Sequence, residues 1–331
     1  MKHLPEISII IPCRNEEKFI AQCLDSILAA DFPKDDMEVL VVDGMSQDKT
    51  RDIVKKYSTQ YPFIYLLDNP KYITPCALNI GIKNAKADIV IRIDAHAKYD
   101  KNYFKNCVKN LALHQADNVG GPIETLESNR SLFSKAIAKT YSSIFGVGSS
   151  FFRIGVKEVK EVDTVFGGCY KKSIFEKIGL FNENLKRSQD MELNLRLKRK
   201  GGKIYLCPDI ISYYYAKSSL KDFFVHNFHD GVWAVYPIKF VKLPLSFRHY
   251  IPLTFVVGLA MLMVAVIIYQ PFFFLLLAYL MLYFCLAFYF AAKIAIYEKD
   301  FSLVWLLPVT FFARHFGYGL GSIVGIIKLF T

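Results

Sequence analysis

The chain has 331 residues, a formal net charge of +11 and a hydrophobic share of 53%. That share is too high for an ordinary soluble enzyme, and the excess lies after residue 250, so a globular part precedes a membrane-like part. The basic charge suits nucleic acid, anionic lipid or phosphorylated substrates, but no recognisable nucleic-acid module is present, which excludes nucleic acid as the expected partner. Seven scattered cysteines without a CxxC pair predict free thiols rather than a disulfide framework or a zinc site.

The first 220 residues alternate short apolar runs with helical patterns. Strands are expected at 6–11, 39–42, 63–67 and 89–93, with Pro12 ending the first of them. Helices are expected at 19–28, from Thr50 onward and at 74–85. This alternation predicts parallel pairing in a doubly wound α/β sheet, and the continuously apolar strands fit burial on both of its faces.

Acidic residues follow three of these strands. Glu16 comes after the first strand, Asp43 after the second and Asp94 after the fourth. Parallel strands bring their carboxyl ends to one edge of the sheet, where ligands bind, so the three acids are expected to gather there. Each acid alone could equally be a helix cap or a turn residue. The phosphate-binding patterns GxGxxG and GxxxxGK[ST] are absent, which excludes an ordinary dinucleotide fold and a P-loop.

The stretch 89–96 reads IVIRIDAH and joins an apolar strand to two possible metal ligands. Asp94 and His96 are two residues apart, so on an extended strand they point to the same face. Together they could hold one divalent cation, which would neutralise a diphosphate. The alternative is an Asp and a His on a solvated loop, and the spacing alone does not decide between the two.

Five segments occur in the order seen in family-two glycosyltransferases: SIIIPCRNEEKFI, VVDGMSQDKT, ALNIGIKNAKADIVIRIDAHA, FGGCYKKSIFEKIGLFNENL and SQDMELNLRLKRKGGKI. Over roughly residues 5–215 the chain resembles these inverting enzymes, which have the GT-A fold, a Rossmann-like and mostly parallel doubly wound sheet. The DAH form is similar to the branch that builds bacterial exopolysaccharides such as succinoglycan. The resemblance implies a metal-dependent hexosyltransferase.

The resemblance also implies roles for individual residues. The residues expected to line the donor-nucleotide pocket are Pro12, Asn15, Glu16, Asp43 and Asp94. Asp94 and His96 take the place of the family's DxD motif, which holds Mg²⁺ or Mn²⁺ and the donor diphosphate. Gly167 and Gly168 are placed beside the donor sugar and the acceptor, although paired glycines could also be a tight turn.

A helix beginning near Gln189 carries the expected catalytic base. The family usually has Glu-Asp where this chain has Gln189-Asp190. By resemblance, Asp190 removes the proton from an acceptor hydroxyl as that oxygen attacks the anomeric carbon, and this single displacement inverts the configuration. Gln189 is placed next to the sugar. Without the resemblance, an isolated Asp here could simply complement the helix dipole.

The remainder of the chain is expected to meet a membrane. We predict a cytoplasmic GT-A domain at 1–218, an amphipathic interfacial segment at 219–249 and a membrane domain at 250–331 with about three transmembrane helices. The apolar segments are 250–269, 272–292 and 303–327. Arg314 in the third needs either a buried ion pair, a snorkelling position or the acceptor's phosphate. Cations before the first span predict a multi-pass protein of the inner (cytoplasmic) membrane with its catalytic domain in the cytoplasm.

The expected reaction is transfer of a sugar from a UDP- or GDP-sugar to a lipid-linked saccharide at the cytoplasmic face, in polysaccharide synthesis. The QxxRW motif of related processive synthases is absent, and His226 and Trp233 occupy a comparable place, which favours addition of one sugar per binding event. The alternatives are transfer directly to polyprenyl phosphate, processive polysaccharide synthesis, and a catalytically inactive membrane scaffold.

Overall fold

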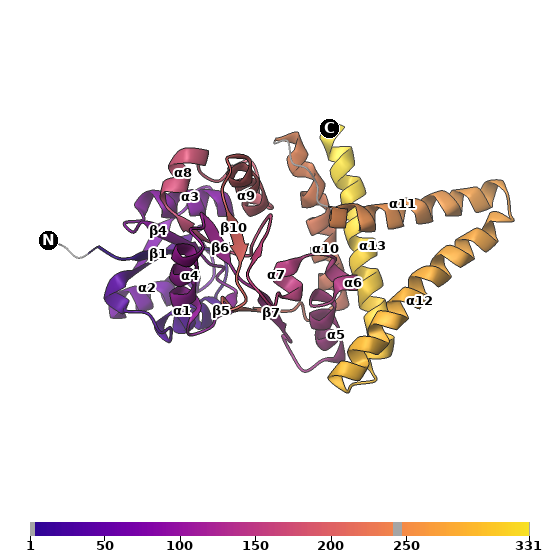
Figure 1. The fold of residues 1–331 in the computed structure, drawn as a ribbon, viewed down its shortest axis with the longest axis horizontal. Helices are drawn as coiled ribbons and strands as arrows, with labels where there is room; N and C mark the ends of the chain where they lie inside the picture. The colour runs from indigo at the N-terminus through magenta and orange to yellow at the C-terminus, as the bar shows by residue number, and fades with distance from the viewer. Residues whose placement is uncertain (1–3, 241–246, 331) are drawn as a thin grey trace. The chain divides into compact units, whose positions relative to one another are not determined.

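The computed structural model describes residues 4–240 and 247–330 (Figure 1). The chain divides into two compact units, of which the first is Met1–Glu124 with Gly155–Tyr214 and the second is Thr125–Ile154 with Tyr215–Thr331. Each unit is therefore built from two separate stretches of the chain. The predicted division at residues 218 and 249 into a catalytic, an interfacial and a membrane part stays a prediction.

The first unit is built on a mixed sheet of eight strands in the order β3-β2-β1-β4-β9-β6-β10-β8 (Figure 1). The strands are β1 Ile7–Cys13, β2 Met37–Asp43, β3 Ile64–Asp68, β4 Ile89–Arg92, β6 Asn118–Gly120, β8 Lys160–Glu161, β9 Cys169–Lys171 and β10 Ile204–Leu206. β1 to β4 pair in parallel, as predicted, whereas β9 runs antiparallel to both β4 and β6. A small sheet in the order β5-β11-β7 consists of Ala97–Tyr99, Ser212–Tyr215 and Ile123–Leu126.

The helices follow the predicted pattern in the N-terminal half. Those of the first unit are α1 Ile20–Leu28, α2 Thr50–Gln60, α3 Thr74–Asn84, α4 Tyr103–Leu113, α8 Ser173–Ile178 and α9 Gln189–Arg199, with a 3₁₀ turn at Lys34–Asp36. Those of the second unit are α5 Leu132–Tyr141, α6 Ile144–Val147, α7 Phe151–Ile154, α10 Leu220–Val235, α11 Phe247–Ile268, α12 Phe272–Glu298 and α13 Leu303–Phe330, with a 3₁₀ turn at Tyr236–Lys239.

Pro12 does not end the first strand, which corrects the sequence prediction. β1 continues to Cys13, and Pro12 lies opposite Val42 of β2. In a parallel strand, alternate residues direct their polar groups to opposite neighbours. The carbonyl of Ile10 accepts from the N–H of Ile93 at 3.1 Å, so Pro12, two residues later, faces the same side, where the pairing with β4 ends opposite Arg92. The missing N–H of Pro12 therefore falls at the point where this pairing ends.

The core of the first unit lies on both faces of this sheet. Ile7, Ile9 and Ile11 point to one face and pack with the buried stripe of α1, while Ile10 points to the other, against α3. Gly81 of α3 lies so close to Ile10 that an added Cβ would come within 2.4 Å of its methyl group. The continuous burial of β1 and β2 follows from helices covering both faces, which confirms the doubly wound prediction.

A carboxylate fixes the segment that leads from α8 to α9. Glu183 accepts from Lys71 Nζ at 2.7 Å and from Asn79 Nδ2 at 3.1 Å, and Asn79 also exchanges hydrogen bonds with the backbone of Phe181. The hydrogen bonds from Lys71, Asn79 and Cys76 lower the pKa of Glu183 to about 2. The chain that carries the start of α9 is thereby held against α3.

This lowered pKa predicts acid sensitivity. Because the folded protein holds the carboxylate ionised, its stabilising effect is complete above the ordinary Glu pKa of 4.5 and is lost as the pH falls towards 2. We expect Glu183→Gln to lower the thermal-unfolding midpoint at pH 7 and to reduce the loss of midpoint between pH 5 and pH 3. Both proteins are compared by calorimetry. An unchanged pH dependence in the variant would contradict this role.

The second unit is helical, with α13 at its centre. α13 packs against α5, α10, α11 and α12. Arg314, halfway along α13, donates to the carbonyl of Gly146 and to Asn227 Oδ1 and lies over the ring of Tyr141. The contacts of Arg314 are thus with a carbonyl, an amide and an aromatic ring of its own unit. α10 buries Phe223, Asn227 and Val232, so this part of the segment predicted to be amphipathic, 219–249, is a helix with one covered face. Residues 241–246 of that segment lie outside the described residues.

Within the described residues, α11 and α12 are long and apolar enough to cross a membrane, and few of their residues are buried. They match the first two predicted spans. The third predicted segment forms α13, which does not meet the same criterion and buries residues along its length, from Leu303 to Gly325. The expectation of a third span is therefore not met. Glycines, a proline and buried polar groups make α13 a packing helix rather than a uniformly apolar one.

Candidate active site

The loops after β1 and β2 are tied together at the carboxyl edge of the sheet. The N–H of Asn15 donates to Ser46 Oγ at 2.8 Å, and Asn15 Oδ1 accepts from the N–H of Gln47 at 2.9 Å. The N–H of Glu16 donates to Thr50 Oγ1 at 2.7 Å. Asn15 has a left-handed backbone with φ 55°, a conformation that Asn tolerates better than most residues. The side chain of Asn15 therefore shapes the loop pair.

Asp43 lies at the end of β2 and is completely buried. Its carboxylate accepts from the N–H and the hydroxyl of Ser46 and from Arg51 Nη1 at 2.7 Å. Arg51 also bonds Asp68 at the end of β3. Asp43 thus holds the loop that begins at Gly44, and its buried carboxylate is already engaged by these donors.

Arg92, the last residue of β4, joins two of the predicted site residues. Its Nη2 donates to Asp94 Oδ1 at 3.0 Å, and its Nη1 donates to Asp190 Oδ2 at 3.0 Å. Burial disfavours the charged guanidinium, but the two carboxylates more than offset this, so the pKa of Arg92 lies above its ordinary value. One guanidinium therefore brings the acid after β4 and the acid at the start of α9 together.

The paired glycines lie directly beside Arg92. The N–H of Arg92 donates to the carbonyl of Gly168 at 2.9 Å. Gly167 and Gly168 have φ of 66° and 115°, and a Cβ on Gly167 would come within 2.8 Å of the Arg92 carbonyl oxygen. A side chain here would push β9 away from β4. These glycines therefore lie next to Arg92 at the same rim of the sheet, and their expected position beside the donor sugar and the acceptor stays a prediction.

The start of α9 presents Gln189 and Asp190. Asp190 is partly exposed, with 28% of its side chain accessible, so an incoming hydroxyl can reach it. Gln189 is buried, and its Oε1 accepts no hydrogen bond from any described residue. Arg92 Nε is likewise buried without an acceptor among these residues. A buried acceptor and a buried donor beside the two acids are contacts that a bound ligand could complete.

Glu192, two residues after Asp190, is buried and has a structural role. It forms a two-pronged pair with Arg196, through Nε at 2.6 Å and Nη2 at 2.8 Å. Arg196 in turn donates to the carbonyls of Ile178, Gly179 and Leu180. This cluster anchors the C-terminal end of α8 to α9.

His96 does not lie on an extended strand with Asp94. β4 ends at Arg92, and His96 lies in a turn that leads into β5, so the alternation argument does not apply to this pair. Tyr99 fixes the turn, because its hydroxyl accepts from the Asp94 N–H at 2.7 Å. His96 Nδ1 lies 3.2 Å from Glu16 Oε1, which brings together residues from the first and fourth strand ends.

Asp94 and His96 fit a metal ion that binds together with its substrate. Within the described part of the chain, no three His, Cys, Asp or Glu side chains gather closely enough to hold an ion by themselves. Asp94 keeps one carboxylate oxygen that Arg92 does not occupy, and His96 is more than one-third exposed. One or two protein ligands completed by phosphate oxygens and water are a usual arrangement for Mg²⁺.

The other predicted residues come from β1 and α10. Pro12 lies within β1, one residue before its carboxyl end. His226 and Trp233 lie on α10 in the second unit, where His226 pairs with Asp230 at 3.4 Å and Trp233 borders a pocket. Sequence reasoning missed Arg92, although an arginine in the buried run IVIR, two residues before Asp94, was a detectable signal, since a buried guanidinium requires a partner.

The model of the family "Glycosyl transferase family 2" matches residues 8–179, more than half of the chain. The chain belongs to glycosyltransferase family 2. A similar family 2 relative is the dolichyl N-acetyl-alpha-D-glucosaminyl phosphate 3-beta-D-2,3-diacetamido-2,3-dideoxy-beta-D-glucuronosyltransferase of Methanococcus voltae, with 38% identity over 68% of this chain and 71% of the relative. The succinoglycan biosynthesis protein ExoA of Rhizobium meliloti is 30% identical over 67% of each chain.

Solved structures confirm the family 2 fold. The mannosyltransferase PcManGT of Pyrobaculum calidifontis, in complex with GDP-Man and Mn²⁺, superposes with a TM-score of 0.61 at 19% identity, over 98% of this chain and 88% of that one. Staphylococcus aureus TarS 1-349 in complex with UDP-GlcNAc superposes with a TM-score of 0.53 at 19% identity, over 98% and 92%. The GT-A architecture predicted from the sequence is therefore correct.

Proposed function

We propose that this family 2 glycosyltransferase is inverting and metal-dependent, and that it moves a sugar from a UDP- or GDP-sugar to a lipid-linked saccharide. The observation that carries the proposal is the Arg92 bridge, because it brings the acid expected at the donor diphosphate and the acid expected at the acceptor hydroxyl to one guanidinium. The name of the Methanococcus voltae relative, a transferase for a dolichyl-linked sugar phosphate, supports a lipid-linked acceptor.

Asp190 acts as the general base. Its carboxylate takes the proton of the acceptor hydroxyl while the hydroxyl oxygen forms a bond to the anomeric carbon. The bond from that carbon to the donor diphosphate breaks, and its electron pair leaves with the nucleoside diphosphate. Arg92 orients Asp190 through its hydrogen bond, and the partial exposure of Asp190 leaves its carboxylate accessible to the acceptor.

Asp94 and His96 are the residues that would hold Mg²⁺ or Mn²⁺. Bound there, a divalent ion would supply positive charge to balance the negative charge of the departing diphosphate. The hydrogen bonds of Asp94 to Arg92 and Tyr99 fix its position before the donor arrives. Asn15, Glu16 and Asp43 organise the neighbouring loops, and Pro12 lies beneath them in β1. Gly167, Gly168 and Gln189 border the place of the sugar.

A screen of UDP- and GDP-sugars with the purified full chain tests the reaction class. Nucleotide release is measured with Mg²⁺, with Mn²⁺ and with chelator, and the anomeric configuration of a transferred sugar is read by NMR. We expect metal-stimulated release with at least one donor and an inverted product. No release with any donor, combined with no nucleotide binding by calorimetry, would instead favour the inactive scaffold.

Asp94→Asn is expected to weaken metal-assisted donor binding. The amide has one oxygen in place of two and no negative charge, so we expect the metal concentration at half-maximal rate to rise by at least about tenfold. Asp88→Asn, at the opposite end of β4 and exposed, is the matched control and should behave as wild type. An Asp94→Asn protein with the wild-type metal dependence would place the metal elsewhere.

We further propose that α11 and α12 anchor the protein in the inner (cytoplasmic) membrane with the catalytic unit on the cytoplasmic side. Their length, composition and exposed apolar side chains support anchoring. Polyprenyl phosphate itself as acceptor, or processive polymerisation, are the competing versions of the same reaction. Product length on a lipid-linked acceptor separates them, since single addition predicts a product one sugar longer.

A further inference from the structure

α10 and α13 approach each other so closely that parts of their contact admit no side chain. A Cβ on Gly321 would lie 2.0 Å from the carbonyl oxygen of Phe228, and one on Gly325 would lie 2.8 Å from that of Val232. Backbones in such close contact cannot slide or separate without losing the packing. The end of this helix pair is therefore a rigid frame.

Beyond this contact, the facing sides of α10 and α13 carry residues with longer side chains. Lys328 follows Gly321 by seven residues and Gly325 by three, so it lies on the face of α13 that touches α10. Tyr236 follows Val232 by four residues and continues the facing stripe of α10 into the next turn. Beyond the glycines, side chains therefore lie between the two helices, and the backbones are no longer in direct contact.

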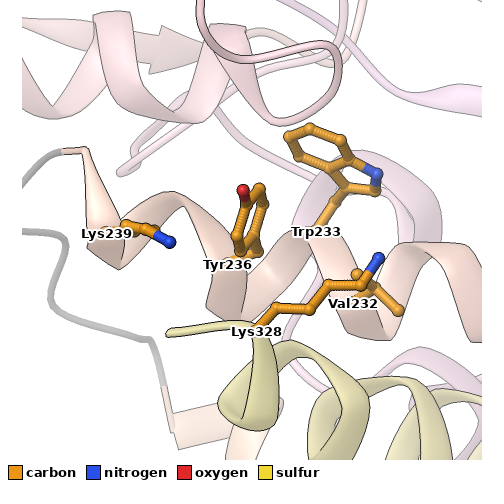
Figure 2. Close-up of a pocket in the computed structure, with 5 residues that line it drawn as sticks. All are labelled: Val232, Trp233, Tyr236, Lys239 and Lys328. Carbon is orange, nitrogen blue, oxygen red and sulfur yellow. The ribbon is translucent and has the colours of Figure 1, made fainter. Parts of the chain in front are cut away.

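These side chains line a pocket of about 320 Å³ within the second unit (Figure 2). Its lining consists of Val232, Trp233, Tyr236, Lys239 and Lys328. Figure 2 shows the two aromatic rings rising from one helical segment, with Lys239 further along it and Lys328 reaching across from α13. Lys239 and Lys328 are both exposed, and neither forms an ion pair with another described residue. The two lysine ammonium groups therefore lie beside the rings of Trp233 and Tyr236, and no described carboxylate pairs with them.

The two lysines and the two aromatic rings indicate which kind of ligand fits the pocket. Ammonium groups bind phosphate oxygens through charge-assisted hydrogen bonds. Aromatic rings with a polar edge offer a flat apolar surface and a hydrogen-bonding group to a sugar ring. The volume lies at the lower end of the roughly 300–1,000 Å³ typical of small-molecule sites, which suits one sugar with its phosphate rather than a whole lipid.

We propose that this pocket binds a glycosyl phosphate, the sugar and phosphate at the head of a lipid-linked acceptor. The identity of the lipid rests on the proposed function. The inference deepens that function, because it adds further acceptor-binding residues to Trp233, namely Tyr236, Lys239 and Lys328. The glycosyl phosphate could also come from a soluble sugar phosphate, which the experiment separates.

Tryptophan fluorescence reports directly on this pocket. The chain has two tryptophans, Trp233 and Trp305, and Trp305 lies exposed on α13. In the full chain carrying Trp305→Phe, Trp233 is the single reporter. Phosphatidylcholine vesicles with dolichyl N-acetylglucosaminyl phosphate, vesicles with phosphatidylglycerol instead, and soluble N-acetylglucosamine 1-phosphate are the three probes.

We expect a saturable change in Trp233 fluorescence with the dolichyl-linked sugar phosphate. Lys239→Gln and Lys328→Gln should each weaken this binding about tenfold, since each removes one charged hydrogen-bond donor. Lys221→Gln, an exposed lysine at the other end of α10, makes the same charge change and should leave binding unaltered. Unchanged unfolding midpoints show that the variants are folded.

Equal binding by the Lys239→Gln, Lys328→Gln double variant would overturn the proposal, as would an equal response to phosphatidylglycerol, which would indicate general attraction to anionic lipid. A lysine-dependent response to the soluble sugar phosphate supports the proposal and shows that the lipid chain is dispensable. Donor hydrolysis is measured separately. Its absence would refute the proposed function but leave the binding result standing.

Discussion

Asp190→Asn is expected to lower the rate of sugar transfer by about 10²- to 10⁴-fold, the usual contribution of a general base. The amide keeps the shape of the side chain and can still contact Arg92 through its oxygen, but it cannot accept the hydroxyl proton. Donor affinity should stay within about twofold of wild type, because Asp94 and the nucleotide loops are unchanged. Steady-state transfer rates and calorimetric donor binding provide the two measurements.

Asp35→Asn is the control for this substitution, since Asp35 is exposed in the loop before β2. It should transfer at the wild-type rate. If Asp190→Asn also transfers at that rate, another group removes the proton. If it loses donor affinity together with rate, Asp190 supports the donor site rather than the acceptor hydroxyl.

Arg92→Met is expected to cause the second large loss. It removes the positive charge that pairs with both Asp94 and Asp190, which lie 3.0 Å from the guanidinium, and leaves the two carboxylates to repel each other. Removing one partner of a buried ion pair costs about 3–5 kcal/mol, and the partial exposure of both acids places the expected loss of unfolding free energy near the lower value. We expect transfer to fall by more than about 100-fold.

Arg92→Lys separates charge from geometry. A lysine keeps one positive charge but lacks the planar fork that reaches both acids, so it should recover stability more fully than transfer. Arg130→Met, at an exposed position, is the control and should change neither. The readouts are the unfolding midpoint and the pH profile of transfer. Recovery of both properties by lysine would show that Arg92 supplies only charge.

The sequence predicted the N-terminal half of the sheet well because its signals are local. β1 and β2 are continuous apolar runs, and the three-and-four spacing of Ile20, Leu24 and Ile27 marks α1. Three strands that complete the sheet, β6, β8 and β9, have two or three residues each, too few to show a period. Their pairing is set by contacts distant in sequence, including the antiparallel insertion of β9.

The sequence predicted which acidic residues belong to the candidate site but not their hydrogen-bond partners. Strand ends identified Glu16, Asp43 and Asp94 as neighbours of one edge, and family resemblance supplied Asp190. Sequence order alone does not reveal that Arg92, next to Asp94, also contacts Asp190, which lies 98 residues further along the chain. It also does not reveal that the carboxylate of Asp43 is already occupied by Ser46 and Arg51. Side-chain partners depend on which loops the fold brings together.

The interleaving of the two units limits how the polypeptide can be divided. Residues 125–154 lie between the two stretches of the first unit, and their α5 packs against α13 near the other end of the sequence. A fragment truncated at residue 218 retains α5 and loses the helix that covers its buried residues, such as Ile137 and Tyr141. Such a fragment carries uncovered apolar surface and is prone to aggregate. Removing the hydrophobic tail is therefore a poor route to a soluble catalytic fragment, and the intact polypeptide in detergent is the better starting material.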